Sequence, residues 1–235
     1  MEDGATASWH PRVVQSLTVL LTVGTGAMDA IGFLRLGDVF TSVMTGNLVL
    51  LGLAAGRADV TLIAHVGVAV GGYVFGAFCG GLLVNRSRGT QLWPTIVTIA
   101  FAVELALLVA FAAVWFAVGG DPDPGLVLGM LALAATAMGM QSAAVRRIGL
   151  PNLSTTYMTG TLTGLVADLA RRSPGSGASV WAGARLAALV CGAAVCALLL
   201  QIAAPLAPVL PVGLLVAVMV TALVANRFAA RTAKQ

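Results

Sequence analysis

The sequence predicts an all-α polytopic integral membrane protein, and three observations support this fold class. Of the 235 residues, 59% are hydrophobic and only 9% are charged, whereas a soluble domain carries about 25% charged residues. The apolar residues gather into eight segments, most of them near the ~20 residues that a helix needs to cross the hydrocarbon. The 28 glycines favour close helix contacts, as in membrane bundles. We therefore expect a single membrane domain over residues 1–235.

Two of the eight segments decide the topology. Segments 40–56 and 153–169 are shorter than the others and contain Thr and Ser, an internal Gly and, in the first, Asn47. We expect them to be short interrupted or re-entrant helices, each leaving the membrane on the face where it enters. Eight full spans are the alternative, because 17 apolar residues can cross a thin bilayer. The six segments expected to span are 13–33, 61–84, 93–118, 126–145, 179–202 and 209–225.

The basic residues favour six spans over eight. If all eight segments cross, seven basic residues fall on one side and five on the other, which gives no orientation signal. With two re-entrant segments, only Arg35 and Arg57 lie on one side and ten lie on the other. Because basic residues are retained in the cytoplasm, we expect both short tails, 1–11 and 229–235, to be cytoplasmic. The ten are Arg12, Arg86, Arg88, Arg146, Arg147, Arg171, Arg172, Arg227, Arg231 and Lys234.

A two-fold internal repeat is predicted by three short matches between the halves of the chain, about 12–118 and 124–228. The clearest match is Met-Thr-Gly-x-Leu, which begins at Met44 and again at Met158. Three spans in each half would relate the halves by inverted topology, and four would give a parallel 4+4 repeat. The matched stretches are 26–30 with 138–142, 44–48 with 158–162, and 70–72 with 190–192.

Four stretches also point to a known family: residues 26–30 (GAMDA), 40–47 (FTSVMTGN), 139–147 (GMQSAAVRR) and 154–162 (STTYMTGTL). They resemble the YoaK-like family of bacterial membrane proteins, a domain of unknown function (1275). The resemblance covers essentially the whole chain and implies a multi-pass protein of the bacterial inner (cytoplasmic) membrane. It implies no catalytic or substrate residues, because the function of the family is itself unknown.

Three charged residues within apolar segments are candidate substrate-binding residues: Asp29, Glu104 and Arg185. A charge deep in the membrane costs at least ~2.5–3.5 kcal/mol on insertion scales, so such a residue is a functional candidate by default. The alternative is an internal salt bridge between Asp29 or Glu104 and Arg185. Arg185 could also extend toward the interface, because it lies near one end of its segment.

The interrupted segments supply the other candidates. A broken helix leaves backbone groups unpaired, and these groups must face protein or a watered cavity. Thr and Asn side chains there could bind a solute, and glycine permits a close backbone approach. A packing seam of small residues is the alternative. The candidates are Thr45, Gly46, Asn47, Thr159, Gly160 and Thr161, with Gln141, which the repeat places opposite Asp29.

These features favour a small-solute transporter or channel with a midplane site at the repeat interface. Half-helix N-termini and Arg185 favour an anionic or carboxylate solute, and Asp29 or Glu104 could couple its movement to protons. A non-transporting scaffold or partner subunit is the alternative. A membrane-embedded enzyme has less support, because the sequence has no HExxH or GxSxG pattern.

We expect no cofactor, no metal and no nucleic-acid partner. Cys79, Cys191 and Cys196 lie in apolar segments without metal-ligand spacing. The basic residues are scattered and form no cluster interleaved with aromatic residues. The expected partners are the lipid bilayer and a small-molecule or ion solute, and association of the chain with copies of itself stays open.

Overall fold

A computed structural model of the chain describes residues 10–85, 93–148, 155–156, 158–170 and 177–232. All regular secondary structure in these residues is helical. The helices are α1 (Pro11–Arg35), α2 (Met44–Gly56), α3 (Val60–Val84), α4 (Thr95–Ala117), α5 (Pro124–Arg147), α6 (Met158–Ala170), α7 (Gly177–Ile202), the short 3₁₀ helix η1 (Ala204–Leu206) and α8 (Val209–Thr232).

Six of the described helices are long and apolar enough to cross a membrane: α1, α3, α4, α5, α7 and α8. Helices α2 and α6 have 13 residues each. At a rise of 1.5 Å per residue they are about 20 Å long, shorter than a hydrocarbon core of about 30 Å. The prediction of an all-α membrane protein with six spanning helices and two short ones is therefore confirmed.

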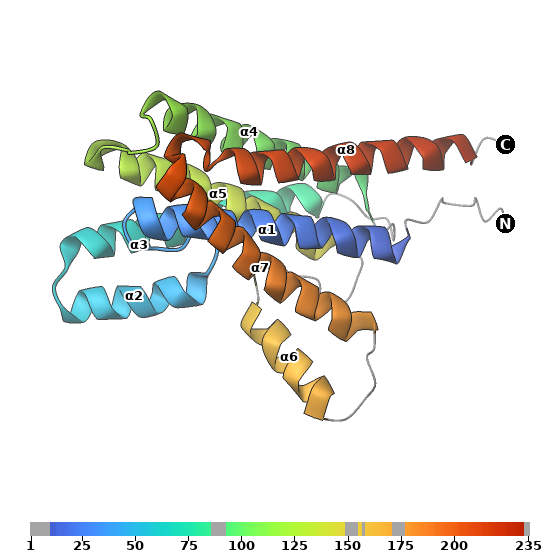
Figure 1. Ribbon diagram of the computed structural model, residues 1–235, viewed down its shortest axis with the longest axis horizontal. Coiled ribbons are helices and arrows are strands. Elements are labelled where there is room, and N and C mark those ends of the chain that lie inside the picture. The colour runs from blue at the N-terminus through green and yellow to red at the C-terminus, as the bar shows by residue number, and fades with distance from the viewer. Residues whose placement is uncertain (1–9, 86–92, 149–154, 157, 171–176, 233–235) are drawn as a thin grey trace.

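Helix α2 enters and leaves at one end of the bundle. The chain turns back into the bundle after α1, and α2 then runs outward again, so that α3 starts where α1 finishes (Figure 1). Gly37, just after α1, lies so close to His65 in the second turn of α3 that a Cβ at position 37 would overlap the imidazole ring. This contact fixes the end of α1 beside the start of α3.

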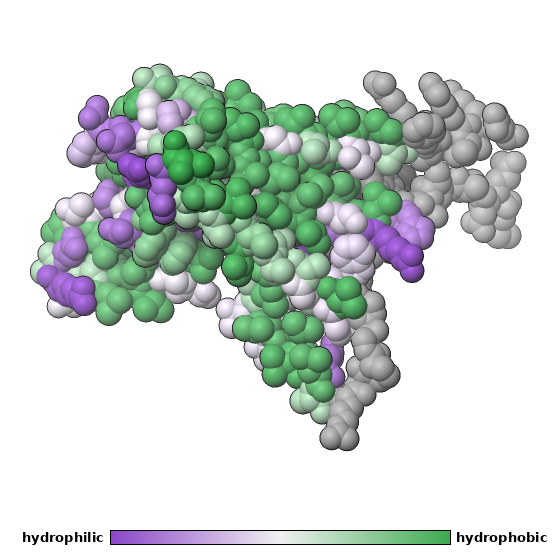
Figure 2. Space-filling view, viewed as in Figure 1, coloured by the Kyte–Doolittle hydropathy of each residue, from purple (hydrophilic) through white to green (hydrophobic). Residues whose placement is uncertain are grey.

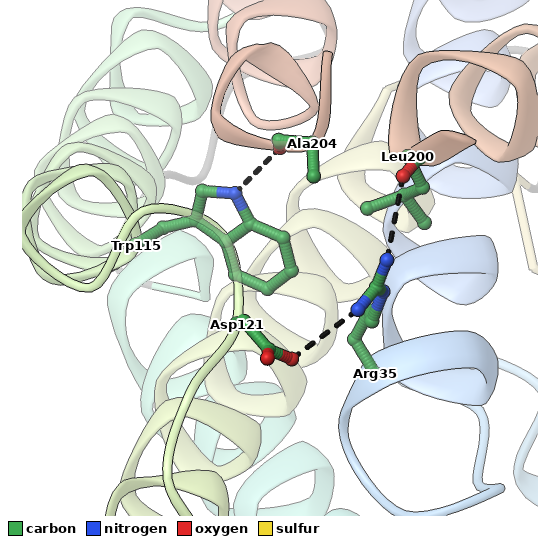
Figure 3. Close-up of polar contacts among 5 residues, drawn as sticks. All are labelled: Arg35, Trp115, Asp121, Leu200 and Ala204. Carbon is green, nitrogen blue, oxygen red and sulfur yellow. Dashed lines mark hydrogen bonds and ion pairs between the residues drawn. The ribbon is translucent and has the colours of Figure 1, made fainter. Parts of the chain in front are cut away.

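The end of the bundle where α1 finishes, here called the Arg35 end, is closed by three polar contacts (Figure 3). Arg35 Nη1 lies 3.2 Å from Asp121 Oδ1, in the connection between α4 and α5. Arg35 Nη2 donates to the Leu200 carbonyl oxygen of α7 at 3.3 Å. Trp115 Nε1 donates to the Ala204 carbonyl oxygen at 2.9 Å. These contacts hold α1, α4, α7 and η1 together.

Basic residues gather at the opposite end, here called the Arg146 end, where α1 begins and α8 finishes (Figure 1). Arg12 lies in the first turn of α1, and Arg146 and Arg147 lie in the last turn of α5. Arg227 and Arg231 belong to the last part of α8. The other basic residues assigned to this side, Arg86, Arg88, Arg171, Arg172 and Lys234, lie outside the described residues.

Between the two ends, the sides of the long helices form an apolar surface (Figure 2). Phe75 and Phe78 of α3 and Val190 of α7 are each more than half exposed. A surface of this kind is stable against lipid tails and would be unfavourable in water. The sides of the bundle are therefore its lipid-contacting surface.

The long helices pack in two groups, and each group contains helices from both halves of the sequence. Helix α1 packs with α7 and α8, whereas α5 packs with α3 and α4. Glycine makes both main contacts: a Cβ at Gly26 of α1 would overlap the Leu189 carbonyl of α7, and a Cβ at Gly139 of α5 would overlap the Tyr73 carbonyl of α3. The two contacts are alike in kind, while duplication of the chain stays a prediction.

Candidate solute site

Asp29 fixes the segment that leads into α2. Its carboxylate is buried near the end of α1 and accepts three hydrogen bonds from two residues. Thr41 Oγ1 donates at 3.0 Å, the Ser42 backbone N–H at 2.7 Å and Ser42 Oγ at 2.6 Å. Donors of this kind satisfy a buried carboxylate, so Asp29 holds the turn before α2 in place.

Asn47 satisfies the backbone of the same interrupted segment. Its side chain is fully buried in the first turn of α2. Asn47 Oδ1 accepts from the Phe40 backbone N–H at 2.9 Å, and Asn47 Nδ2 donates to the Phe40 carbonyl oxygen at 2.7 Å. The amide therefore replaces the partners that a continuous helix would give Phe40. Asp29 and Asn47 together stabilise the non-helical segment between α1 and α2.

Gln141 of α5 has a comparable place before α6. Its Nε2 donates to Thr25 Oγ1 of α1 at 2.8 Å and to Thr155 Oγ1 at 3.2 Å. The hydroxyl oxygens of Ser142 and Thr156 lie 3.3 Å apart. Gln141 thus joins α1, α5 and the residues that precede α6.

Glu104 carries a buried carboxyl group near the middle of α4. The side chain is fully buried, and neither carboxyl oxygen has a hydrogen-bond partner among the residues that the structure describes. It lines a cavity of about 10 Å³, which is room for about one water molecule. The cavity lies where α1 and α8 meet α4 and α5, and its lining is Leu21, Gly24, Glu104, Leu108, Met138, Gln141, Pro211, Leu214 and Leu215.

Arg185 of α7 is the second buried charged group whose hydrogen bonding is incomplete. Its side chain is 5% exposed, Nη1 donates to Gln15 Oε1 at 2.7 Å, and Nε has no partner within the described ranges. The salt bridge considered as an alternative for Asp29, Glu104 and Arg185 is not formed. Asp29 accepts hydrogen bonds from Thr41 and Ser42, and the carboxyl oxygens of Glu104 have no partner in the part of the chain that the structure describes.

The two Met-Thr-Gly motifs lie apart from Glu104 and its cavity. Thr45 and Thr159 are exposed, and Gly46, Gly160 and Thr161 are half-buried. Helix α2 packs against α3, and α6 packs against α7. The structure therefore brings Gln141 and Glu104 together, whereas Asp29 and Asn47 form a separate cluster with the segment before α2. Solute contact at the two motifs stays a prediction.

Sequence reasoning missed a row of neutral polar residues on one face of α1. Thr18, Thr22 and Thr25 are fully buried, and their hydroxyl groups donate to the carbonyl oxygens of Gln15, Thr18 and Leu21 at 2.7, 2.7 and 3.0 Å. With Gln15 and Asp29 the spacing is 3, 4, 3 and 4 residues, which keeps the side chains within an arc of about 80°. We call this row the polar face of α1. The regular spacing of these five residues is the sequence signal that could have identified the row.

The bundle and its buried polar groups define a multi-pass integral membrane protein with ionisable groups held inside the span. The family model described as "Protein of unknown function (DUF1275)" matches residues 17–221. The chain belongs to this family, so the resemblance seen in the sequence is confirmed. It is similar to the UPF0700 transmembrane protein YoaK of Bacillus subtilis (strain 168), with 38% identity over 157 residues that cover 67% of this chain and 68% of that protein. No solved structure matches the chain.

Proposed function

We propose that the protein transports a small polar solute across a bacterial inner membrane, with Glu104 on the transport path. The observation that supports this function is the Glu104 carboxyl group, which is buried at mid-helix and has no hydrogen-bond partner in the described part of the chain. A scaffold has no use for such a group, because an isolated carboxylate in an apolar medium is very costly. An ionisable residue inside a membrane bundle is a functional-site hypothesis by default.

The position of the cavity suggests how the transporter works. The cavity lies between the α1, α7, α8 group and the α3, α4, α5 group. Rocking of one helix group against the other would open such a site to one side of the membrane at a time. In the closed bundle, Glu104 is held neutral by a bound proton, because its carboxylate form would have no partner. When the cavity opens to water the proton can leave, so that solute movement is coupled to proton movement.

Uptake by vesicles containing the purified full-length chain tests this function. The panel comprises small anions, amino acids and inorganic ions, with and without an imposed proton gradient. We expect uptake of at least one solute to depend on the gradient. The Glu104→Gln variant should fold, since Gln has the same shape and no charge, but its gradient-driven uptake should fall to that of empty vesicles.

The matched control is Asp123→Asn, which makes the same change from carboxyl to amide at an exposed residue without a side-chain cap hydrogen bond. It should transport like the native protein. Native, gradient-driven uptake by Glu104→Gln would contradict the role of Glu104. Failure of the native chain to transport any solute of the panel would contradict the transport function.

The orientation proposed for the bundle places the Arg35 end in the periplasm and the Arg146 end in the cytoplasm, as the distribution of basic residues favours. We expect a cysteine at position 57 to react with an impermeant thiol reagent in intact cells. A cysteine at position 146 should react only after the membrane is opened. Cys79, Cys191 and Cys196 are first replaced by alanine. Labelling of position 57 only after opening the membrane would reverse the orientation.

A further inference from the structure

Arg185 carries a positive charge inside the bundle that no described carboxylate balances. It lies about 12 Å along α7 from Gly177, which places it within the span. Nη1 donates to the neutral amide oxygen of Gln15, and no described residue accepts from the buried Nε–H. A guanidinium has five N–H donors and stays charged, so among the described residues this site lacks a counter-charge and an acceptor for the Nε–H.

The polar face of α1 links Arg185 to the cavity that contains Glu104. Gln15 accepts from Arg185, and Thr25, ten residues further along α1, accepts from Gln141 in the cavity wall. Ten residues of helix span about 15 Å. Thr18 and Thr22 lie between them, both fully buried. The threonine hydroxyl groups donate within α1, and each keeps lone pairs that water can bond.

We propose that Arg185 and Gln15 form a binding site for a small anion that presents two oxygen atoms to the guanidinium, either a carboxylate or an inorganic oxyanion. This inference rests on the proposed function and names the class of its solute. The guanidinium fork matches two oxygen atoms of such an anion, and the anion supplies the missing counter-charge. A cation would be repelled, and a neutral solute would leave the charge uncompensated.

Arg185 and Glu104 would bind ligands of opposite charge, an anion and a proton. An anion at Arg185 and a proton on Glu104 together carry no net charge. Transport of this pair moves one anion and one proton in the same direction and breaks no covalent bond. A neutral pair avoids the cost of moving a single charge through the hydrocarbon. The separation of about 15 Å along α1 makes the anion site and the proton site distinct.

The test measures anion binding separately from transport. Purified full-length protein in a neutral detergent is titrated with sodium acetate, sodium nitrate and sodium phosphate at constant ionic strength, by calorimetry and by thermal unfolding. At least one anion should bind saturably. Arg185→Gln should raise its Kd by at least about tenfold, because charge-assisted hydrogen bonds are lost. Arg185→Lys keeps the charge without the fork, so it should fold and give an intermediate Kd.

Arg146→Gln is the matched control, since it removes an exposed arginine at the same end of the bundle. Its Kd should equal that of the native chain. An unchanged Kd in both Arg185 variants would overturn the inference. Stabilisation by phosphatidylglycerol vesicles without any binding of the soluble anions would assign Arg185 to a lipid headgroup and would also overturn it.

The proposed function and this inference fail in different ways. Glu104-dependent uptake of a neutral solute, with no anion bound at Arg185, would overturn the anion site and leave transport standing. Anion binding that Arg185→Gln abolishes, with no uptake of any solute in the panel, would support the site and contradict transport.

Discussion

Replacing Gly26 by alanine is expected to lower the free energy of unfolding by about 3 kcal/mol or more, at the upper end of the usual cost of overpacking. A Cβ at this position would overlap the Leu189 carbonyl, and the Ala193 backbone nitrogen lies close by. Both obstacles are backbone atoms, so α1 and α7 must move apart. Thermal unfolding in detergent measures the loss.

Gly71→Ala provides the control for Gly26→Ala. Gly71 lies on an exposed part of α3, where a Cβ would have nothing within 4 Å. Alanine there should be neutral or should stabilise α3 by up to about 1 kcal/mol, because glycine is the weaker helix former. Equal stability of the two variants would show that α1 and α7 do not make this contact.

Replacing Asp29 by alanine is expected to cost about 3 kcal/mol or more, because three buried donors lose their acceptor at about 1 kcal/mol or more each. The donors are the Thr41 hydroxyl and the backbone N–H and hydroxyl of Ser42. The segment before α2 should then exchange its amide hydrogens faster. Hydrogen exchange at Ser42 and thermal unfolding measure the two effects.

Asp29→Asn separates a structural role from a proton-carrying role. The amide oxygen can still accept from the Ser42 N–H, and the Ser42 hydroxyl can turn to accept from the new amide N–H. This variant should therefore keep most of the stability and all of the proton-coupled uptake. Loss of uptake by a well-folded Asp29→Asn protein would place Asp29 with Glu104 in proton transfer.

The number of spans and the two short helices could be predicted from the sequence because both follow from local properties. Segment length decides what can cross, and the distribution of charge follows from the side on which each loop lies. The burial of Asp29, Glu104 and Arg185 could be expected for a similar reason, since lipid exposure of a charge is costly.

The partners of these residues could not be predicted from the sequence. Packing of α1 with α7 depends on glycines that fit one particular carbonyl, and a sequence with 28 glycines offers many such pairings. A helix that is apolar on every side has no hydrophobic periodicity to indicate which of its sides faces a neighbouring helix. The oxygen that Arg185 bonds belongs to Gln15, and searching for charge pairs alone overlooks a neutral partner.

The polar face of α1 was not predicted from the sequence, because most of its residues are neutral. Thr18, Thr22 and Thr25 cost little in a membrane helix, because each hydroxyl can bond a carbonyl of its own helix. They therefore do not stand out by composition. Their regular spacing with Gln15 and Asp29 is the signal, and it becomes visible when α1 is examined for polar periodicity.

The packing of α1 against α7 has a consequence for the biogenesis of the protein. α1 is synthesised before α7, so the contact of Gly26 with Leu189 and Ala193 cannot form until those two residues have left the ribosome. At about 5–20 residues per second, that wait lasts about 10 to 30 seconds. Asp29 bonds Thr41 and Ser42, which lie only 12 and 13 residues downstream, so these hydrogen bonds can form early in synthesis. Gln15 bonds Arg185 of α7, so a nascent chain that stops before α7 leaves this part of α1 without that partner.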